Sequence, residues 1–270
     1  MVVNNNYKPV VKKLARFGCF SIGTVYVLVG IMALLSFLGE TAEDAADEER
    51  IMDRIMEIPL GEVIIGALII GLLGYIIWRV FEAITDPYKF GNDAKGLARR
   101  IGIALSASGY ALIAFSSAEI LFGERQENGE EEQQIMVAEV LNWTAGAWLV
   151  GAVGVIVGLA GLVQFKYVIQ GDHNPRLAIE HLSDKKRSII QFLAHTGYFA
   201  RGLILLVIGY LIVYAAVQGE PGAVGDTDSA FDFIGGGVIG SVFLVLVAIG
   251  TICYGAFMYV SAVYYSFRRG

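Results

Sequence analysis

The stretch LARFGCFSIGTVYVLVGIMALLSFLGE, residues 14–40, decides the fold because its frame occurs three times along the chain. The frame is a basic residue and a glycine, then an apolar run with two small residues seven apart, then glycine followed by glutamate. The first copy places these features at Arg16, Gly18, Gly23, Gly30 and Gly39-Glu40. The second has Arg100, Gly102, Ala107, Ala114 and Gly123-Glu124, and the third has His195, Gly197, Gly202, Gly209 and Gly219-Glu220. Such spacing indicates tandem structural repeats.

The composition places these repeats in a membrane. Of the 270 residues, 56% are apolar, and the mean hydropathy of +0.60 is too high for an ordinary soluble domain. Six continuous apolar stretches have the roughly 20 residues that a helix needs to cross a bilayer. They are 15–38, 61–84, 100–122, 143–168, 192–217 and 236–266. We therefore expect an all-α integral membrane protein with six transmembrane helices. The first is too long for the apolar core of a secretory signal, so we expect it to be retained.

The placement of basic residues predicts the topology. Lysine and arginine gather before the first helix, after the second and fourth helices, and at the end of the chain. The three alternate loops carry only Arg50, Arg54 and Arg125. Because cytoplasmic loops carry the excess of lysine and arginine, both termini and the two linkers between repeats are expected in the cytoplasm.

Each repeat is predicted to be a helical hairpin, with one helix running outward and the next running back. The hairpins occupy residues 1–98, 99–191 and 192–270, counting the tail and the cytoplasmic linkers with them. Two helices restore the starting orientation, so the three hairpins run parallel. Parallel repeats are related by an axis along the membrane normal, here a pseudo-threefold axis.

Small residues recur at helical spacing and predict close helix packing. In lipid, helices associate through van der Waals contact, which small side chains permit. Contact between copies in a homo-oligomer is the alternative interpretation. The positions are Gly71, Gly74, Gly151, Gly154, Gly158, Gly161, Gly202 and Gly209.

The second helices of the three hairpins also align with one another, and here the copies differ in their polar groups. One position holds Arg79, Lys166 and Met258, and another holds Glu82, Ile169 and Ser261.

The chain resembles the bacterial membrane family catalogued as the domain of unknown function 1206. The resemblance rests on the triplicated hairpin, on Ala200-Arg201-Gly202, and on Gly-Tyr-x-x-Trp-Arg ending at Arg79. The chain departs from the family pattern at Ile22 and Ser106, where the third copy has Arg201. The resemblance implies the fold, the topology and a bacterial cytoplasmic (inner) membrane, and it implies no activity.

Four ionisable residues within predicted spans form a candidate intramembrane cluster: Arg79, Glu82, Lys166 and Arg201. Such groups are costly in a bilayer and point to function. Arg79 and Glu82 are three residues apart and can pair on one helix face. Arg201 needs an acceptor, for which Glu82 is the best candidate. The structural alternative is that all four lie near the inner helix ends and extend to the headgroups.

No sequence motif of an active site, a metal site or a cofactor is present, so we expect neither catalysis nor a bound cofactor or metal. The cysteines, Cys19 and Cys253, are expected as buried apolar filler. The outer loops are acidic, which favours solubility and topology, with cation collection as the alternative. Asp226, Asp228 and Asp232 provide oxygen ligands without the full spacing of a calcium loop.

Two functions remain open. The first is a non-catalytic membrane protein that binds lipid or a partner through its helix faces. The second is a channel or small-solute transporter with a path along the pseudo-threefold axis. A path would require polar residues at equivalent depths in all three repeats, which the Met258 and Ile169 positions do not provide. We therefore favour the first, with the lipid bilayer, a protein partner or a second copy as binding partners and no nucleic acid.

Overall fold

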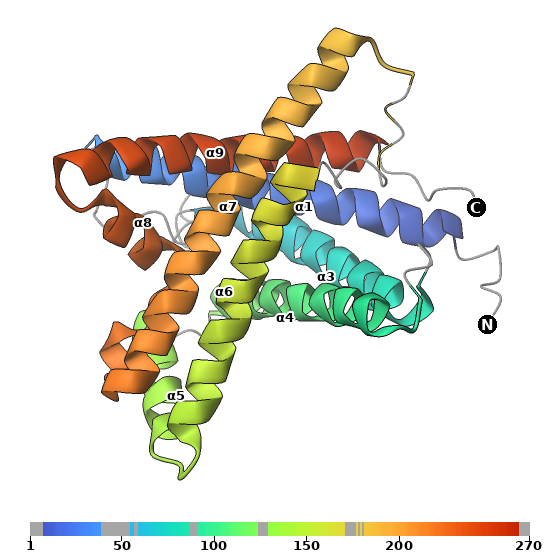
Figure 1. The fold of residues 1–270 in the computed structure, drawn as a ribbon. Helices are drawn as coiled ribbons and strands as arrows, with labels where there is room; N and C mark the ends of the chain where they lie inside the picture. The colour runs from blue at the N-terminus through green and yellow to red at the C-terminus, as the bar shows by residue number, and fades with distance from the viewer. Residues whose placement is uncertain are drawn as a thin grey trace.

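The computed structural model describes residues 8–38, 55–56, 59–86, 91–123, 129–170, 177, 179 and 181–264. Over these residues the chain is almost entirely helical and forms no strand (Figure 1). The long helices are α1 (Lys8–Phe37), α3 (Gly61–Thr85), α4 (Ala94–Phe122), α6 (Gly146–Gln170), α7 (Asp184–Gln218) and α9 (Gly237–Tyr264). The shorter elements are α5 (Gly129–Leu141), η2 (Pro221–Ala223) and α8 (Thr227–Gly235).

Five of the long helices are long and apolar enough to cross a membrane: α1, α3, α6, α7 and α9. The stretch expected at 100–122 lies within α4, where the described residues include a shorter apolar segment, Ile113–Phe122. Over the described residues the fold is all-helical and multi-pass, with five candidate spans by length and composition, and the sixth expected span is not confirmed.

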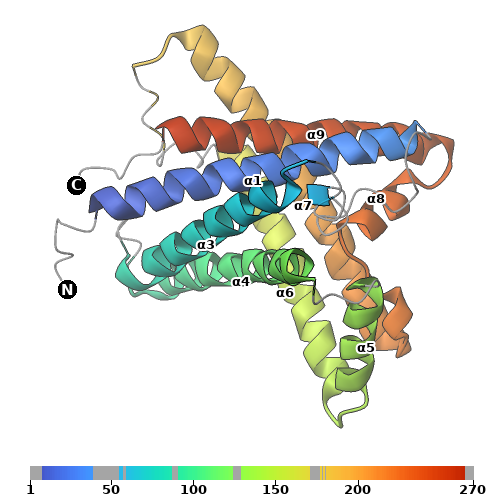
Figure 2. The same cartoon turned by 180° about the vertical axis from the view of Figure 1, so that it is seen from behind.

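The long helices contact one another in a cyclic order. The second helix of each hairpin packs against the first helix of the next, giving the pairs α3–α4, α6–α7 and α9–α1. Figures 1 and 2 show the α6–α7 pair crossing the α1–α9 pair, with α3 and α4 side by side below α1 and α9. The last hairpin thus returns to the first, and α9 lies antiparallel to α1.

The first and third hairpins close through equivalent residues. A Cβ built on Gly18 would lie 2.5 Å from the Cβ of Tyr75, and one built on Gly197 would lie 2.5 Å from the Cα of Tyr254. The next contact in each hairpin joins a glycine of the second helix to a small residue of the first: Gly71 to Ser21, and Gly250 to Ala200. Only glycine permits helix backbones to approach this closely.

The second hairpin is open in this structure. Gly102 and Gly158 occupy the positions of Gly18 and Gly71, yet a Cβ added to either would meet nothing within 4 Å. Among the described residues, α4 and α6 make no extensive contact. Two of the three hairpins are therefore closed, and the arrangement of the described helices is not threefold as a whole.

Contacts between successive hairpins use the two small residues of the repeated frame. On α1, a Cβ at Gly23 would lie 2.8 Å from the carbonyl oxygen of Gly255, and one at Gly30 would lie 2.7 Å from that of Ala248. The equivalent residues of α7 face α6 in the same way. A Cβ at Gly202 would lie 3.1 Å from the Gly161 oxygen, and one at Gly209 would lie 2.8 Å from the Gly154 oxygen.

The basic residue of the frame caps the helix that ends the preceding hairpin. Arg16 Nη2 donates to the Val263 carbonyl oxygen at 2.8 Å, and Arg100 Nη2 donates to that of Ile84 at 3.0 Å. Val263 and Ile84 are equivalent in the repeat alignment. The last carbonyls of a helix lack intrahelical partners and carry partial negative charge, so a guanidinium satisfies them well. The matching carbonyl for His195 lies outside the described residues.

The equivalent glycines Gly197 and Gly102 provide a matched test of this packing. We expect Gly197→Ala to lower the free energy of unfolding by about 1–3 kcal/mol, because the added methyl meets the α9 backbone. Gly102→Ala adds the same methyl in open space, so its effect should stay within about 0.5 kcal/mol. Reversible unfolding in mixed detergent micelles would measure both. A Gly102→Ala protein as unstable as Gly197→Ala would mean that the second hairpin closes as the other two do.

Candidate functional site

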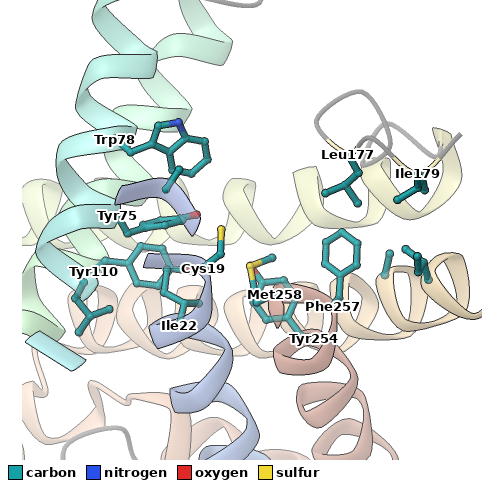
Figure 3. Packing of buried hydrophobic residues seen from close by; sticks show 14 of the residues in the cluster. Cys19, Ile22, Tyr75, Trp78, Tyr110, Leu177, Ile179, Tyr254, Phe257 and Met258 are labelled. Atoms are coloured by element: carbon teal, nitrogen blue, oxygen red, sulfur yellow. The ribbon is translucent and has the colours of Figure 1, made fainter. Parts of the chain in front are cut away.

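Aromatic side chains fill the place where the three repeats meet. Figure 3 shows Tyr75, Tyr110 and Tyr254 within this part of the buried core. The rings of Tyr75 and Tyr110 meet edge to face with centroids 4.9 Å apart, and those of Tyr254 and Tyr26 do the same at 4.9 Å. We call these four residues the tyrosine cluster.

The two ring pairs of the tyrosine cluster are the same contact made twice. Tyr26 and Tyr110 hold one repeat position, on α1 and α4, and Tyr75 and Tyr254 hold another, on α3 and α9. In each pair, the second helix of one hairpin meets the first helix of the next. The third repeat has Leu205 at the first of these positions. The pairs form because α3–α4 and α9–α1 pack in the same register.

Arg201 on α7 lies against the tyrosine cluster. Its Cζ is 4.8 Å from the centroid of the Tyr26 ring, 4.9 Å from that of Tyr254 and 5.5 Å from that of Tyr110. These rings come from the first, third and second repeats. A guanidinium over aromatic faces gains cation–π attraction, which is stronger where water is excluded.

The predicted partner of Arg201 is wrong. Glu82 pairs with Arg79 instead, and the neighbours of Arg201 are tyrosine rings. Within the described part of the chain, Arg201 Nε and Nη1 are buried and have no hydrogen-bond acceptor. Ring faces satisfy the charge of a guanidinium, but they do not accept its in-plane N–H bonds as oxygen does.

Arg79 and Glu82 form the ion pair that their three-residue spacing predicts, with Arg79 Nη1 3.1 Å from Glu82 Oε2. Arg79 Nε also donates to the Tyr75 hydroxyl at 2.9 Å, and its Cζ lies 4.9 Å from the centroid of the Trp78 ring. Glu82 has a side-chain exposure of 0%. This arginine is therefore held by a carboxylate, a hydroxyl and ring faces together.

Lys166 does not join the cluster. It is exposed on α6, although it is equivalent to Arg79. The difference follows from packing, because α3 lies between α1 and α4, whereas the only long helix that α6 packs against extensively is α7. Of the four candidate residues, Arg79 and Arg201 both contact the tyrosine cluster and Glu82 pairs with Arg79, whereas Lys166 lies apart from them.

The predicted small-residue positions lie at helix contacts, with one partial exception. Gly71 and Gly74 face α1, where a Cβ on Gly74 would lie 3.4 Å from Leu14. The other six line the α6–α7 contact: Gly151, Gly154, Gly158, Gly161, Gly202 and Gly209. A Cβ built on Gly209 would meet the backbone of Gly158, whereas a Cβ built on Gly158 itself would meet nothing within 4 Å.

The acidic segments between the long helices add little to the site in the described residues. Asp226 caps α8, because its Oδ1 accepts hydrogen bonds from the backbone nitrogen of Ser229 at 2.9 Å and from its hydroxyl at 3.0 Å. That use of the carboxylate explains Asp226 without a cation. Most of the first acidic loop, residues 39–54 and 57–58, lies outside the described residues.

Sequence reasoning missed the tyrosine cluster. The signal was present, since Tyr26 and Tyr110 share one repeat position and Tyr75 and Tyr254 share another. Aromatic residues of a membrane protein are easily assigned to interfacial belts. Their recurrence at equivalent positions next to the helix-packing glycines marks them instead as interior residues.

These features define a multi-pass helical membrane protein built from three tandem hairpins. The chain belongs to the family described as Domain of Unknown Function (DUF1206), which matches residues 17–86, 101–169 and 196–265. The three matches coincide with the three hairpins. The chain is also similar to an uncharacterized protein, YxxB, of Bacillus subtilis (strain 168), with 29% identity over 97% of this chain and 94% of that protein. No solved structure matches the chain.

The buried Arg79–Glu82 pair leads to a stability prediction. We expect Glu82→Gln to reduce the free energy of unfolding by about 3 kcal/mol, because it leaves the arginine without its counter-charge. Lys166→Gln changes an exposed side chain, so it should alter the free energy of unfolding by no more than about 0.5 kcal/mol. Unfolding of Arg79→Gln, Glu82→Gln and the double variant gives the coupling energy. Additive effects of the two single changes would show that the pair contributes nothing.

Proposed function

We propose that this protein is a non-catalytic membrane protein that binds lipid or a partner through the face of its second hairpin. The proposal rests on one observation: among the described residues, α4 and α6 do not pack against each other as the two helices of the other hairpins do. Gly102 and Gly158 repeat the glycines that join the other two hairpins, yet their added Cβ atoms would meet nothing. Small residues on a helix face admit another helix or an acyl chain at close range.

Exposed apolar side chains around this face support the proposal. On α6, Leu159 and Leu162 are 54% and 53% exposed, and on α4 Phe115 is 64% exposed. In a spanning helix such residues contact lipid or another helix. The equivalent faces of the first and third hairpins are covered from within the chain, so the second hairpin is the one with room for an external occupant.

A channel or small-solute transporter is the second candidate. The buried cations Arg79 and Arg201 favour it, because ionisable groups in a membrane often mark a transport path. Two features weigh against it. The place where the repeats meet is occupied by tyrosine rings, and polar groups do not recur at equivalent depths in all three copies.

We further propose six spans around a pseudo-threefold axis, with α4 as the sixth. Supporting this, the α3–α4, α6–α7 and α9–α1 contacts follow one cyclic order, and the Arg16 and Arg100 caps repeat in it. Successive spans must run in opposite directions. If α3 and α6 both run back across the membrane, α4 must therefore cross it between them. Both termini are then cytoplasmic, in the inner membrane of a bacterium.

Cysteine labelling tests this topology. In a background with Cys19→Ser and Cys253→Ser, a membrane-impermeant maleimide added to intact bacterial cells should label Glu220→Cys. It should leave Asn5→Cys unlabelled until the cells are permeabilised. The positive-inside rule is expected to place the N-terminus and the start of α7 in the cytoplasm. Because α7 crosses the membrane once, Glu220, which follows its far end, should then lie outside. Labelling of Asn5→Cys in intact cells would reverse the topology.

Native mass spectrometry of the protein released from mild detergent tests the proposed function. We expect mass in excess of one chain, as stoichiometric lipid or a second polypeptide. Gly158→Leu, which fills the open face, should reduce that retained mass, while Gly66→Leu on α3, also in open space, should not. A bare monomer together with sustained ion or solute flux in liposomes would replace the binding proposal with the transport one.

A further inference from the structure

We propose that Arg201 is an anion-binding site that takes the phosphate or carboxylate of an anionic lipid headgroup. The inference rests on the proposed function and gives it a location and a ligand class. The site consists of the Arg201 guanidinium and the rings of Tyr26, Tyr110 and Tyr254. One ring comes from each repeat, so the site exists only where all three meet.

The two buried arginines differ in how their nitrogens are satisfied. Arg79 has a carboxylate oxygen at 3.1 Å and a tyrosine hydroxyl at 2.9 Å. In the described part of the chain, Arg201 lies against ring faces and its buried Nε and Nη1 have no hydrogen-bond acceptor. Arginine remains protonated at any accessible pH, so it cannot relieve this deficit by losing its proton. An acceptor oxygen from outside the chain would satisfy it.

The chemistry of the site favours an oxyanion. Guanidinium donates two parallel N–H bonds to carboxylate or phosphate, and these charge-assisted bonds are about twice as strong as neutral ones. A second cation is excluded by charge, and a neutral ligand would leave the arginine without a counter-charge. The tyrosine rings lie close to the guanidinium carbon, and the buried Nε and Nη1 are the groups that an oxyanion would satisfy.

The depth of Arg201 favours an anion carried on an acyl chain. Arg201 follows His195, the frame residue equivalent to the helix-capping Arg16 and Arg100, by six residues. At 1.5 Å per residue, it lies about 9 Å further into the membrane than the capped helix ends. A free anion would lose its hydration on the way, whereas a lipid headgroup starts at the interface with its chains already in hydrocarbon.

The approach to Arg201 is from the side of α4. Of the three helices that supply rings, α1 packs between α3 and α9, and α9 packs between α1 and α7. Among the described long helices, α4 packs extensively against α3 alone. Its Tyr110 ring is also the furthest from the guanidinium, at 5.5 Å. The lipid chains would then lie along the exposed apolar face of the open hairpin.

Lipid titration followed by native mass spectrometry tests the site. Delipidated protein is titrated with phosphatidylglycerol or phosphatidylcholine of identical chains. We expect the wild type to bind the first phosphatidylglycerol at least about tenfold more tightly, since hydrogen bonds to charged groups are the strong ones. Arg201→Gln should lose this preference. Lys166→Gln, which removes an exposed cation on α6, should keep it.

The outcomes separate the inference from the proposed function. Equal binding of both lipids by the wild type, or an unchanged preference in Arg201→Gln, overturns the assignment of Arg201 to a lipid headgroup and leaves lipid binding intact. Binding of neither lipid, with no retained partner, overturns the proposed function itself. Stabilisation of the wild type but not Arg201→Gln by millimolar inorganic phosphate, with equal binding of both lipids, assigns the site to a free anion.

Two further variants keep the test decisive if Arg201→Gln does not fold. Arg201→Lys keeps the charge but replaces the planar fork with a compact ammonium, so the preference should fall severalfold. Tyr110→Leu, which copies Leu205 of the third repeat, opens the α4 side of the site and should tighten phosphatidylglycerol binding without changing phosphatidylcholine binding. Unchanged affinities in both variants overturn the proposal.

Discussion

Close approach of helix backbones at glycine is the constraint on which the rest of this structure depends. Lipid is as apolar as the helix surface, so the helices gain little from the hydrophobic effect and must touch to associate. The contacts of Gly23 with Gly255 and of Gly202 with Gly161 set the register between hairpins. That register brings Tyr26 against Tyr254 and places Arg201 beside both. A side chain at these glycines would separate the helices and dismantle the tyrosine cluster.

Much of the fold could be predicted from the sequence, because the repeated frame has a direct physical meaning. On α1 and α7, the small residues seven apart mark the side that meets the preceding hairpin, and Arg16 and Arg100 each cap a helix. The short helices α5 and α8 were not predicted, because they lie in the acidic segments that join the long apolar stretches. The sixth span was predicted from the length of its apolar stretch, and the described residues confirm the helix α4 but not its crossing of the membrane.

The candidate site was predicted less well than the fold. The Arg79–Glu82 pair could be predicted because it is local, three residues apart on one helix. The environment of Arg201 could not, because it depends on rings from helices α1, α4 and α9. Repeat alignment states which residues are equivalent, but it does not state which helix each one faces. Equivalence also failed for Lys166, which is exposed because the second hairpin is open.

The contact between α1 and α9 has a consequence for how the protein is made. The hydrogen bond from Arg16 to Val263 joins residues 247 positions apart. During synthesis, α1 enters the bilayer first, and the helix that covers its Gly23 and Gly30 leaves the ribosome last. For most of translation this glycine face is therefore turned to lipid or to a component of the insertion machinery. The ring of contacts closes only after chain release, so assembly is a post-translational step with high contact order.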